Sequence, residues 1–76
     1  MDYQEEKVIE KEEALNIKQL IDELKEPYKQ VFHLRYYGEL SFEEIGSIFE
    51  KSAGWARIVY YRAKKQVLEG MEEENE

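Results

Sequence analysis

The 76-residue chain contains no cysteine and a single histidine, and these absences exclude two kinds of site at once. Without thiols, neither a disulfide framework nor a thiolate metal site can hold the fold together. His33 has no second histidine to pair with, so we expect a partly exposed helix position rather than a metal ligand. The sequence therefore predicts no metal site and no cofactor, and the lack of cysteine fits a reducing cytoplasm.

Long apolar runs are also missing. No stretch approaches the ~18 apolar residues of a membrane span, and the charged start MDYQEEKVIEKEE lacks the basic-then-apolar order of a signal peptide. The chain also has no nucleophile–base pair, no metal-ligand spacing and no glycine-rich phosphate loop. We therefore expect a soluble, cytoplasmic protein that is not an enzyme.

Charge is distributed unevenly along the chain. The net charge is −7, yet residues 51–68 hold five basic residues and no acidic one, whereas residues 69–76 hold five acids and no base. Proteins that bind a nucleic-acid backbone gain affinity by neutralising phosphates with Lys and Arg. The overall charge thus argues against nucleic acid, and the segment 51–68 argues for it.

A capping box marks the start of a short helix in the second half of the chain. Ser41 and Glu44 have the S-x-x-E spacing in which a hydroxyl and a carboxylate each cap a free backbone amide. A helix should therefore begin at Phe42. Apolar residues then recur at helical spacing and give this helix one apolar face, made by Phe42, Ile45 and Ile48 or Phe49.

A second helix should follow after a tight break, with Ser52 as its N-cap and Ala53 in its first turn. Its core stripe is predicted from steps of four, three and four residues: Ala56, Tyr60, Ala63 and Val67. The opposite side is aromatic, basic and apolar, and comprises Trp55, Arg57, Ile58, Tyr61, Arg62 and Lys65, with Lys64 and Val59 at its edges. A solvent-facing surface of this kind needs a partner.

Two further helices are predicted upstream of this pair. Ile17, Leu20, Ile21 and Leu24 follow the spacing of an amphipathic helix. Pro27 should end that helix and start the next, which continues until Gly38. The predicted fold is all-α: a small four-helix domain over residues 14–68 with a C-terminal helix-turn-helix. Residues 1–13 are expected to be a charged linker or a frayed helix extension, and residues 69–76 a disordered acidic tail.

Four segments carry a resemblance to a known family: LRYY from Leu34, LSFEEI from Leu40, Ser52 with Gly54, and YRAKK from Tyr61. Residues 34–65 resemble region 4 of the sigma-70 family of transcription initiation factors, most closely the compact extracytoplasmic-function (ECF) type. The resemblance implies a module that recognises the promoter −35 element and docks on the β flap of RNA polymerase to direct transcription initiation. Nothing in the chain resembles region 2 of such factors, so we expect an excised region 4 rather than a free-standing relative.

The resemblance also implies roles for individual residues. Arg35, Phe42 and Glu43 would lie beside the DNA backbone. Arg57, Tyr61 and Arg62 would enter the major groove, and Lys64 would contact a phosphate. The complete DNA-binding set implied in this way is Arg35, Phe42, Glu43, Gly54, Trp55, Arg57, Ile58, Val59, Tyr61, Arg62, Lys64 and Lys65. Arg62 is the predicted base reader, since a guanidinium can engage O6 and N7 of guanine together.

The chain departs from the family pattern on the face predicted to read DNA. Trp55, Ile58 and Val59 stand where the family usually has threonine, serine and arginine. Such a helix can touch thymine methyl groups but has fewer groups that hydrogen-bond a base edge. An alternative function is therefore a protein-interaction module that docks a regulator, such as an anti-sigma factor, through these three residues.

Overall fold

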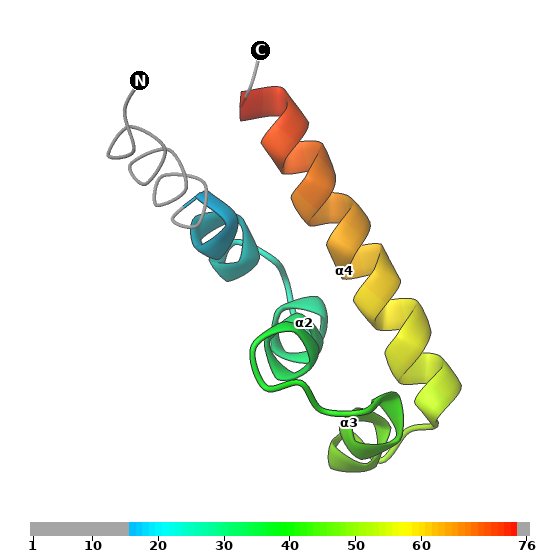
Figure 1. The fold of residues 1–76 in the computed structure, drawn as a ribbon. Helices are drawn as coiled ribbons and strands as arrows, with labels where there is room; N and C mark the ends of the chain where they lie inside the picture. The colour runs from blue at the N-terminus through cyan, green and yellow to red at the C-terminus, as the bar shows by residue number, and fades with distance from the viewer. Residues whose placement is uncertain (1–15, 75–76) are drawn as a thin grey trace, which may run out of the picture.

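The computed structural model describes residues 16–74 and shows four helical pieces joined by short connections (Figure 1). A first helical segment covers residues 16–22 and is followed by α2 (Tyr28–Tyr36), α3 (Phe42–Ile48) and α4 (Ala53–Glu74). No strand occurs in this part of the chain. The predicted all-α fold with a C-terminal helix-turn-helix is confirmed, whereas the linker or frayed extension expected at residues 1–13 lies outside the described residues.

The long helix α4 organises the fold because it packs against both α2 and α3 (Figure 1). Where α4 meets α3, the buried residues form a group that we call the α3 cluster: Val31, Ile45, Ala56 and Val59. Further along α4, a second group packs against α2 and the first helical segment, and we call it the N-terminal cluster: Ile21, Leu24, Phe32, Ala63 and Val67. Thus α2 contributes to both clusters, whereas α3 contacts one half of α4 and the first helical segment contacts the other.

The helix boundaries follow local signals closely. Ser41 caps α3 as predicted, with its hydroxyl accepting from the Glu44 amide at 3.0 Å and the Glu44 carboxylate accepting from the Ser41 amide at 2.8 Å. The Ser52 hydroxyl accepts from the Trp55 amide at 3.0 Å, so the predicted start of α4 is confirmed. Pro27 stands at the N-cap of α2, one position before the expected first turn, because Tyr28 is the first helical residue.

The prediction of a disordered acidic tail is wrong for residues 69–74, because α4 continues as a helix to Glu74. The helical pattern of the sequence could not predict this, because residues 69–74 contact a segment far away in the chain. Met71 packs on the N-terminal cluster, and a Cβ placed on Gly70 would lie 2.7 Å from a methyl group of Leu20. The last turns of α4 therefore bury part of their surface against the first helical segment.

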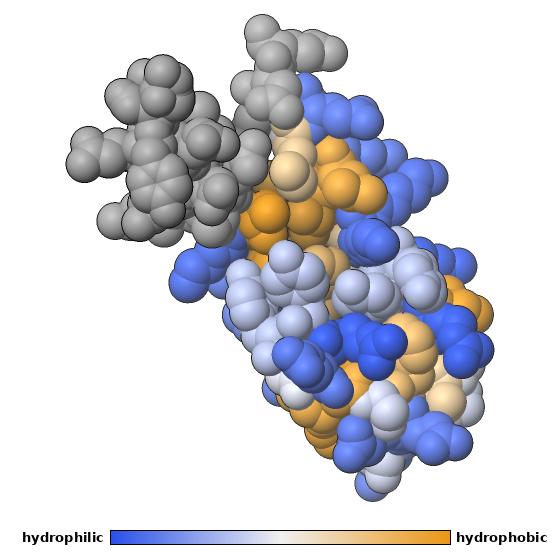
Figure 2. All heavy atoms as spheres, viewed as in Figure 1, coloured by the Kyte–Doolittle hydropathy of each residue, from blue (hydrophilic) through white to orange (hydrophobic). Residues whose placement is uncertain are grey.

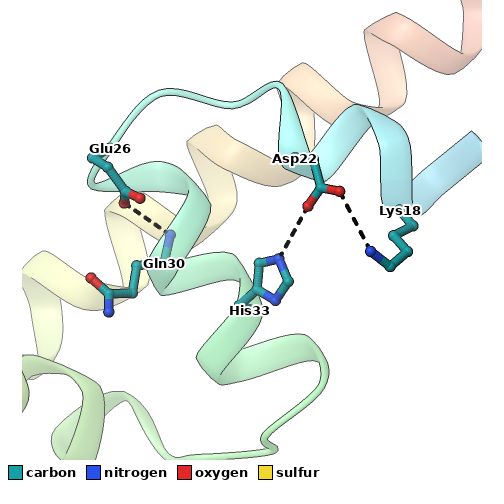
Figure 3. A network of polar contacts seen from close by, with 5 residues as sticks. All are labelled: Lys18, Asp22, Glu26, Gln30 and His33. Atoms are coloured by element: carbon teal, nitrogen blue, oxygen red, sulfur yellow. Dashed lines mark hydrogen bonds and ion pairs between the residues drawn. The ribbon is translucent and has the colours of Figure 1, made fainter.

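A small polar network joins the first helical segment to α2 (Figure 3). The Asp22 carboxylate lies 3.5 Å from Lys18 Nζ and 3.7 Å from His33 Nε2. Nearby, the backbone amide of Gln30 donates to the Glu26 carboxylate at 3.2 Å. Lys18 and Asp22 are more than half exposed, so their ion pair adds little to the free energy of folding.

Candidate nucleic-acid interface

The turn between α3 and α4 fixes the angle at which the basic helix is presented. Within it the Lys51 amide donates to the Gly46 carbonyl at 2.7 Å. Gly46 is buried, and a Cβ at this position would lie 2.6 Å from the Ser52 carbonyl oxygen and 2.7 Å from that of Lys51. Only glycine permits this close approach of the α3 backbone to the start of α4.

The outward side of α4 is basic and exposed, as the sequence predicted. This side carries four cationic side chains, all exposed: Arg57, Arg62, Lys64 and Lys65. Within residues 16–74 the ion pairs found involve Lys18, Asp22 and His33, and none of these four cations. Their charge is thus not neutralised by the described acidic side chains, which leaves it available for an anionic partner.

Phe42, the first residue of α3, lies close to two arginines from different helices. Cζ of Arg35 is 4.3 Å from the centroid of the Phe42 ring, and Cζ of Arg57 is 5.3 Å from it. Both distances allow attraction between the guanidinium and the negative face of the ring. Arg35 also donates through Nη1 to the Leu40 carbonyl at 2.9 Å. Arg35 therefore ties α2 to the loop before α3, while Arg57 remains exposed and partly oriented.

Aromatic rings connect this arrangement to the interior. The Phe42 ring lies 5.9 Å from Tyr60 and 6.2 Å from Tyr61, and Tyr60 stacks on Phe32 at 5.2 Å between centroids. Burial raises the pKa of Tyr60 above its ordinary value, and the Arg35 guanidinium acts in the opposite direction. Tyr60 consequently stays neutral at physiological pH and contributes packing rather than charge.

Two of the apolar residues predicted on the partner face are placed differently by the structure. Val59 is only 6% exposed and belongs to the α3 cluster, so its placement on the outward face is wrong. Trp55 is half-buried, packing on the same cluster with its ring 5.3 Å from that of Phe49. Ile58 does lie outside, with 53% of its surface exposed. The predicted apolar docking face is thereby reduced mainly to Ile58.

The remaining predicted residues lie as expected or close to it. Glu43 is exposed in the first turn of α3, and Gly54 is exposed in the first turn of α4. Tyr61 is 52% exposed, with Lys64 Nζ 5.9 Å from its ring centroid. Phe42 is half-buried. The structure therefore gathers most of the predicted set around α3 and the first three turns of α4.

An apolar groove of about 120 Å³ opens beside the more C-terminal part of α4, and it was not among the features predicted from the sequence. It is lined by side chains from the first helical segment, α2 and α4: Ile17, Phe32, Tyr36, Tyr60, Lys64, Val67, Leu68 and Met71. Figure 2 shows hydrophobic surface on this half of α4. Phe32 and Tyr36 are four residues apart on α2, which was the one available signal. Their recurrence at helical spacing marks a shared face.

Two other kinds of site are not found in the described part of the chain. No group of three or more His, Cys, Asp or Glu side chains within it could hold a metal ion. No described helix is both long and apolar enough to cross a membrane.

Comparison with protein families places the chain in a known family. The family model described as "Sigma-70, region 4" matches residues 14–67 of the chain. No curated protein and no solved structure matches the chain. The matched residues include α2, α3, the turn between α3 and α4, and most of α4.

Proposed function

The chain belongs to the sigma-70 region 4 family of non-enzymatic DNA-binding modules, and on this premise we propose that it recognises the promoter −35 element and docks on RNA polymerase to direct transcription initiation. The ECF type, suggested by the LRYY and LSFEEI segments, and action in the cytoplasm are part of the same proposal. The observation that carries it is the exposed basic side of α4 on a helix-turn-helix.

In the proposed complex, the first three turns of α4 lie in the major groove of duplex DNA and α3 crosses the backbone. Arg62 is exposed and has no described ion-pair partner, so its guanidinium is available to pair with a guanine. Arg57 lies beside Phe42 near the start of α3, where it can contact a phosphate or a base edge. Lys64 and Lys65 add charge toward the backbone.

Arg35 has a different role in this proposal from the one implied by the family resemblance. The Arg35 guanidinium is already engaged within the protein, by its hydrogen bond to the Leu40 carbonyl and by its contact with the Phe42 ring. We therefore propose that Arg35 positions Phe42, and through that ring Arg57, rather than binding the DNA backbone directly. A side chain held in this way loses less conformational entropy when the complex forms.

The second part of the proposal concerns RNA polymerase. The apolar groove beside α2 is suited to an apolar segment of a protein partner. Most of its α4 residues belong to the C-terminal half of that helix, with Tyr60 and Lys64 at the border with the first half. DNA and polymerase could therefore be bound together. The alternative regulator-docking surface of Trp55, Ile58 and Val59 is less well supported, because Val59 is buried and Trp55 is half-buried.

The test is selection of bound duplexes from a random-sequence pool, using the full chain fused to the polymerase β flap so that weak binding is recorded. We expect one short motif to be enriched. Arg62→Ala should relax the preference at one position, at a loss of ~1–3 kcal/mol of discrimination. Lys64→Ala should weaken binding to all sequences alike and reduce the dependence on salt.

Lys51→Ala is the matched control for this experiment, because Lys51 is an exposed cation in the turn and outside the proposed DNA set. It should leave the motif unchanged. An equal loss of affinity for every sequence with both Arg62→Ala and Lys64→Ala would refute Arg62 as the base reader. No enriched motif despite a folded fusion protein would refute promoter recognition.

A further inference from the structure

The most outward ridge of α4 is formed by residues spaced four, three and four apart: Gly54, Ile58, Tyr61 and Lys65. Residues at this spacing line one side of a helix. The buried residues of α4 lie on the other side: Ala56, Val59, Ala63 and Val67. Ile58 therefore stands at the centre of the surface that the proposed function places in the major groove.

Ile58 is unusual on this surface because it is the one large aliphatic side chain among cations and a tyrosine. It is 53% exposed, with the exposed Arg57 next to it in the chain and the exposed Arg62 four residues later. The side chain has no hydrogen-bond donor or acceptor, so it cannot read a base edge as Arg62 can. Any preference it confers must come from apolar contact.

The major groove of DNA offers an apolar group on one base only. Adenine, guanine and cytosine present hydrogen-bonding groups there, whereas thymine adds its 5-methyl group. Covering that methyl group with an aliphatic side chain removes apolar surface of both partners from water. An isoleucine in this place thus favours thymine over cytosine.

The ridge next to Ile58 is open enough for close approach. Gly54 lies one turn earlier, and a Cβ built on it would meet only the Ser52 hydroxyl oxygen, at 3.8 Å. No side chain projects from this position, so the groove edge can come close to the backbone of α4 beside Ile58. Tyr61 continues the ridge on the other side with 52% of its surface exposed.

From these observations we propose that Ile58 is a specificity-determining residue that selects thymine through its 5-methyl group in the major groove. The proposal rests on the proposed DNA-binding function and adds to it a second means of base discrimination beside Arg62. It also assigns a role to an exposed apolar side chain that belongs to neither buried cluster of residues 16–74.

Replacement of thymine by deoxyuridine tests this directly, since uracil lacks only the methyl group and keeps every hydrogen-bonding atom of thymine. The probes are the duplexes recovered by the selection above, with each thymine replaced in turn and binding measured with the same flap fusion. We expect one thymine position whose replacement weakens binding about fourfold, the effect of ~0.8 kcal/mol per buried methyl-sized group. The Ile58→Ala variant should bind the thymine and deoxyuridine duplexes equally well.

Two controls separate the possible results. Ile58→Val keeps a branched aliphatic side chain and should retain part of the thymine preference. Arg62→Ala should keep the sensitivity to deoxyuridine, although it loses the base preference at the position that Arg62 is proposed to read. Circular dichroism should show unchanged helicity for Ile58→Ala, because this side chain lies outside both buried clusters.

Binding that is indifferent to deoxyuridine at every position overturns the proposal, as does a deoxyuridine effect that persists unchanged in Ile58→Ala. In both cases the enriched motif itself still supports promoter recognition, so the two proposals fail separately. Loss of flap binding in Ile58→Ala, without any methyl dependence, also overturns the proposal and assigns Ile58 to a protein contact.

Discussion

The two halves of α4 differ in how their positions are determined. The first half packs on α3, and local contacts define both helices: Ser41 caps the start of α3, Ser52 caps the start of α4, and Gly46 allows their close approach. The second half packs on α2 and the first helical segment, whose residues lie some 30 to 50 positions earlier in the sequence. The proposed DNA-binding half is thus built mainly from local interactions, and the other half from distant ones.

The largest expected effect comes from truncating the fully buried isoleucine of each cluster. Ile45→Ala and Ile21→Ala each remove a side chain with 0% exposure, and each should cost about 3 kcal/mol of unfolding free energy. Urea unfolding measures the cost. Hydrogen exchange should then show lost amide protection mainly in α3 for Ile45→Ala, and mainly in the first helical segment for Ile21→Ala.

The milder changes Ile45→Val and Ile21→Val, at about 1 kcal/mol each, keep this comparison possible if the alanine variants do not fold. Equal loss of protection throughout the chain in both variants would show that the two halves unfold as one unit. The two halves of α4 would then differ in the residues that they contact but not in when they unfold.

The next effect concerns two glycines that lie near the same turn. Gly46→Ala should destabilise the chain by about 2–3 kcal/mol, because the added methyl group meets backbone atoms that cannot move aside easily. Gly54→Ala should instead stabilise it by up to about 1 kcal/mol, since its surroundings are open and alanine favours a helix. Thermal unfolding of the two variants side by side checks the difference in sign. A similar loss in both would mean that the α3–α4 turn is not closely packed.

A smaller effect is expected from the capping box. Ser41→Ala removes the acceptor for the Glu44 amide and should cost about 1 kcal/mol, with fraying at the start of α3. Ser47 lies exposed on the same short helix and makes no described hydrogen bond through its hydroxyl, so Ser47→Ala is a suitable control with little expected effect. Chemical denaturation measures both. Equal denaturation midpoints for the two variants would contradict the conclusion that local interactions determine the structure of α3 and the first half of α4.

The smallest effect is a pH dependence on the alkaline side. Because burial raises the pKa of Tyr60 in the folded state, the neutral phenol is favoured there. Its contribution to stability is therefore complete below the unfolded value of about 10 and is lost as pH rises through the folded value. When the pH is raised from neutral to above about 10, Tyr60→Phe should lose less stability than the parent chain. Thermal unfolding at several pH values measures this difference. Tyr37→Phe, on an exposed ring, controls for the loss of a hydroxyl.

The sequence predicted the features that depend on near neighbours in the chain. The starts of α3 and α4 follow from Ser41 and Ser52, because capping involves residues only three positions apart. Most of the core stripe of α4 was also predicted. Val59 was misplaced because it lies near the border of the stripe, where spacing alone does not distinguish a buried position from an exposed one.

The features that the sequence did not reveal bring together residues distant in the chain. The contacts of the Phe42 ring with Arg35 and Arg57 involve three helices, and no spacing rule connects them. The helical course of residues 69–74 depends on Leu20 meeting Gly70, and the apolar groove depends on how three helical pieces pack. In each case tertiary packing decided the outcome, which local pattern cannot predict.

The unbroken course of α4 has a mechanical consequence. Ile58 and Leu68 lie on one helix, and ten residues of helix separate them by about 15 Å along its axis. A continuous helix resists bending and twisting, so the direction faced by the proposed DNA surface is set relative to the groove that is proposed to hold polymerase. Inserting a single residue between the two surfaces would rotate one against the other by about 100°. The helix thus acts as a rigid spacer that fixes both the separation and the angular phase of the two proposed partners.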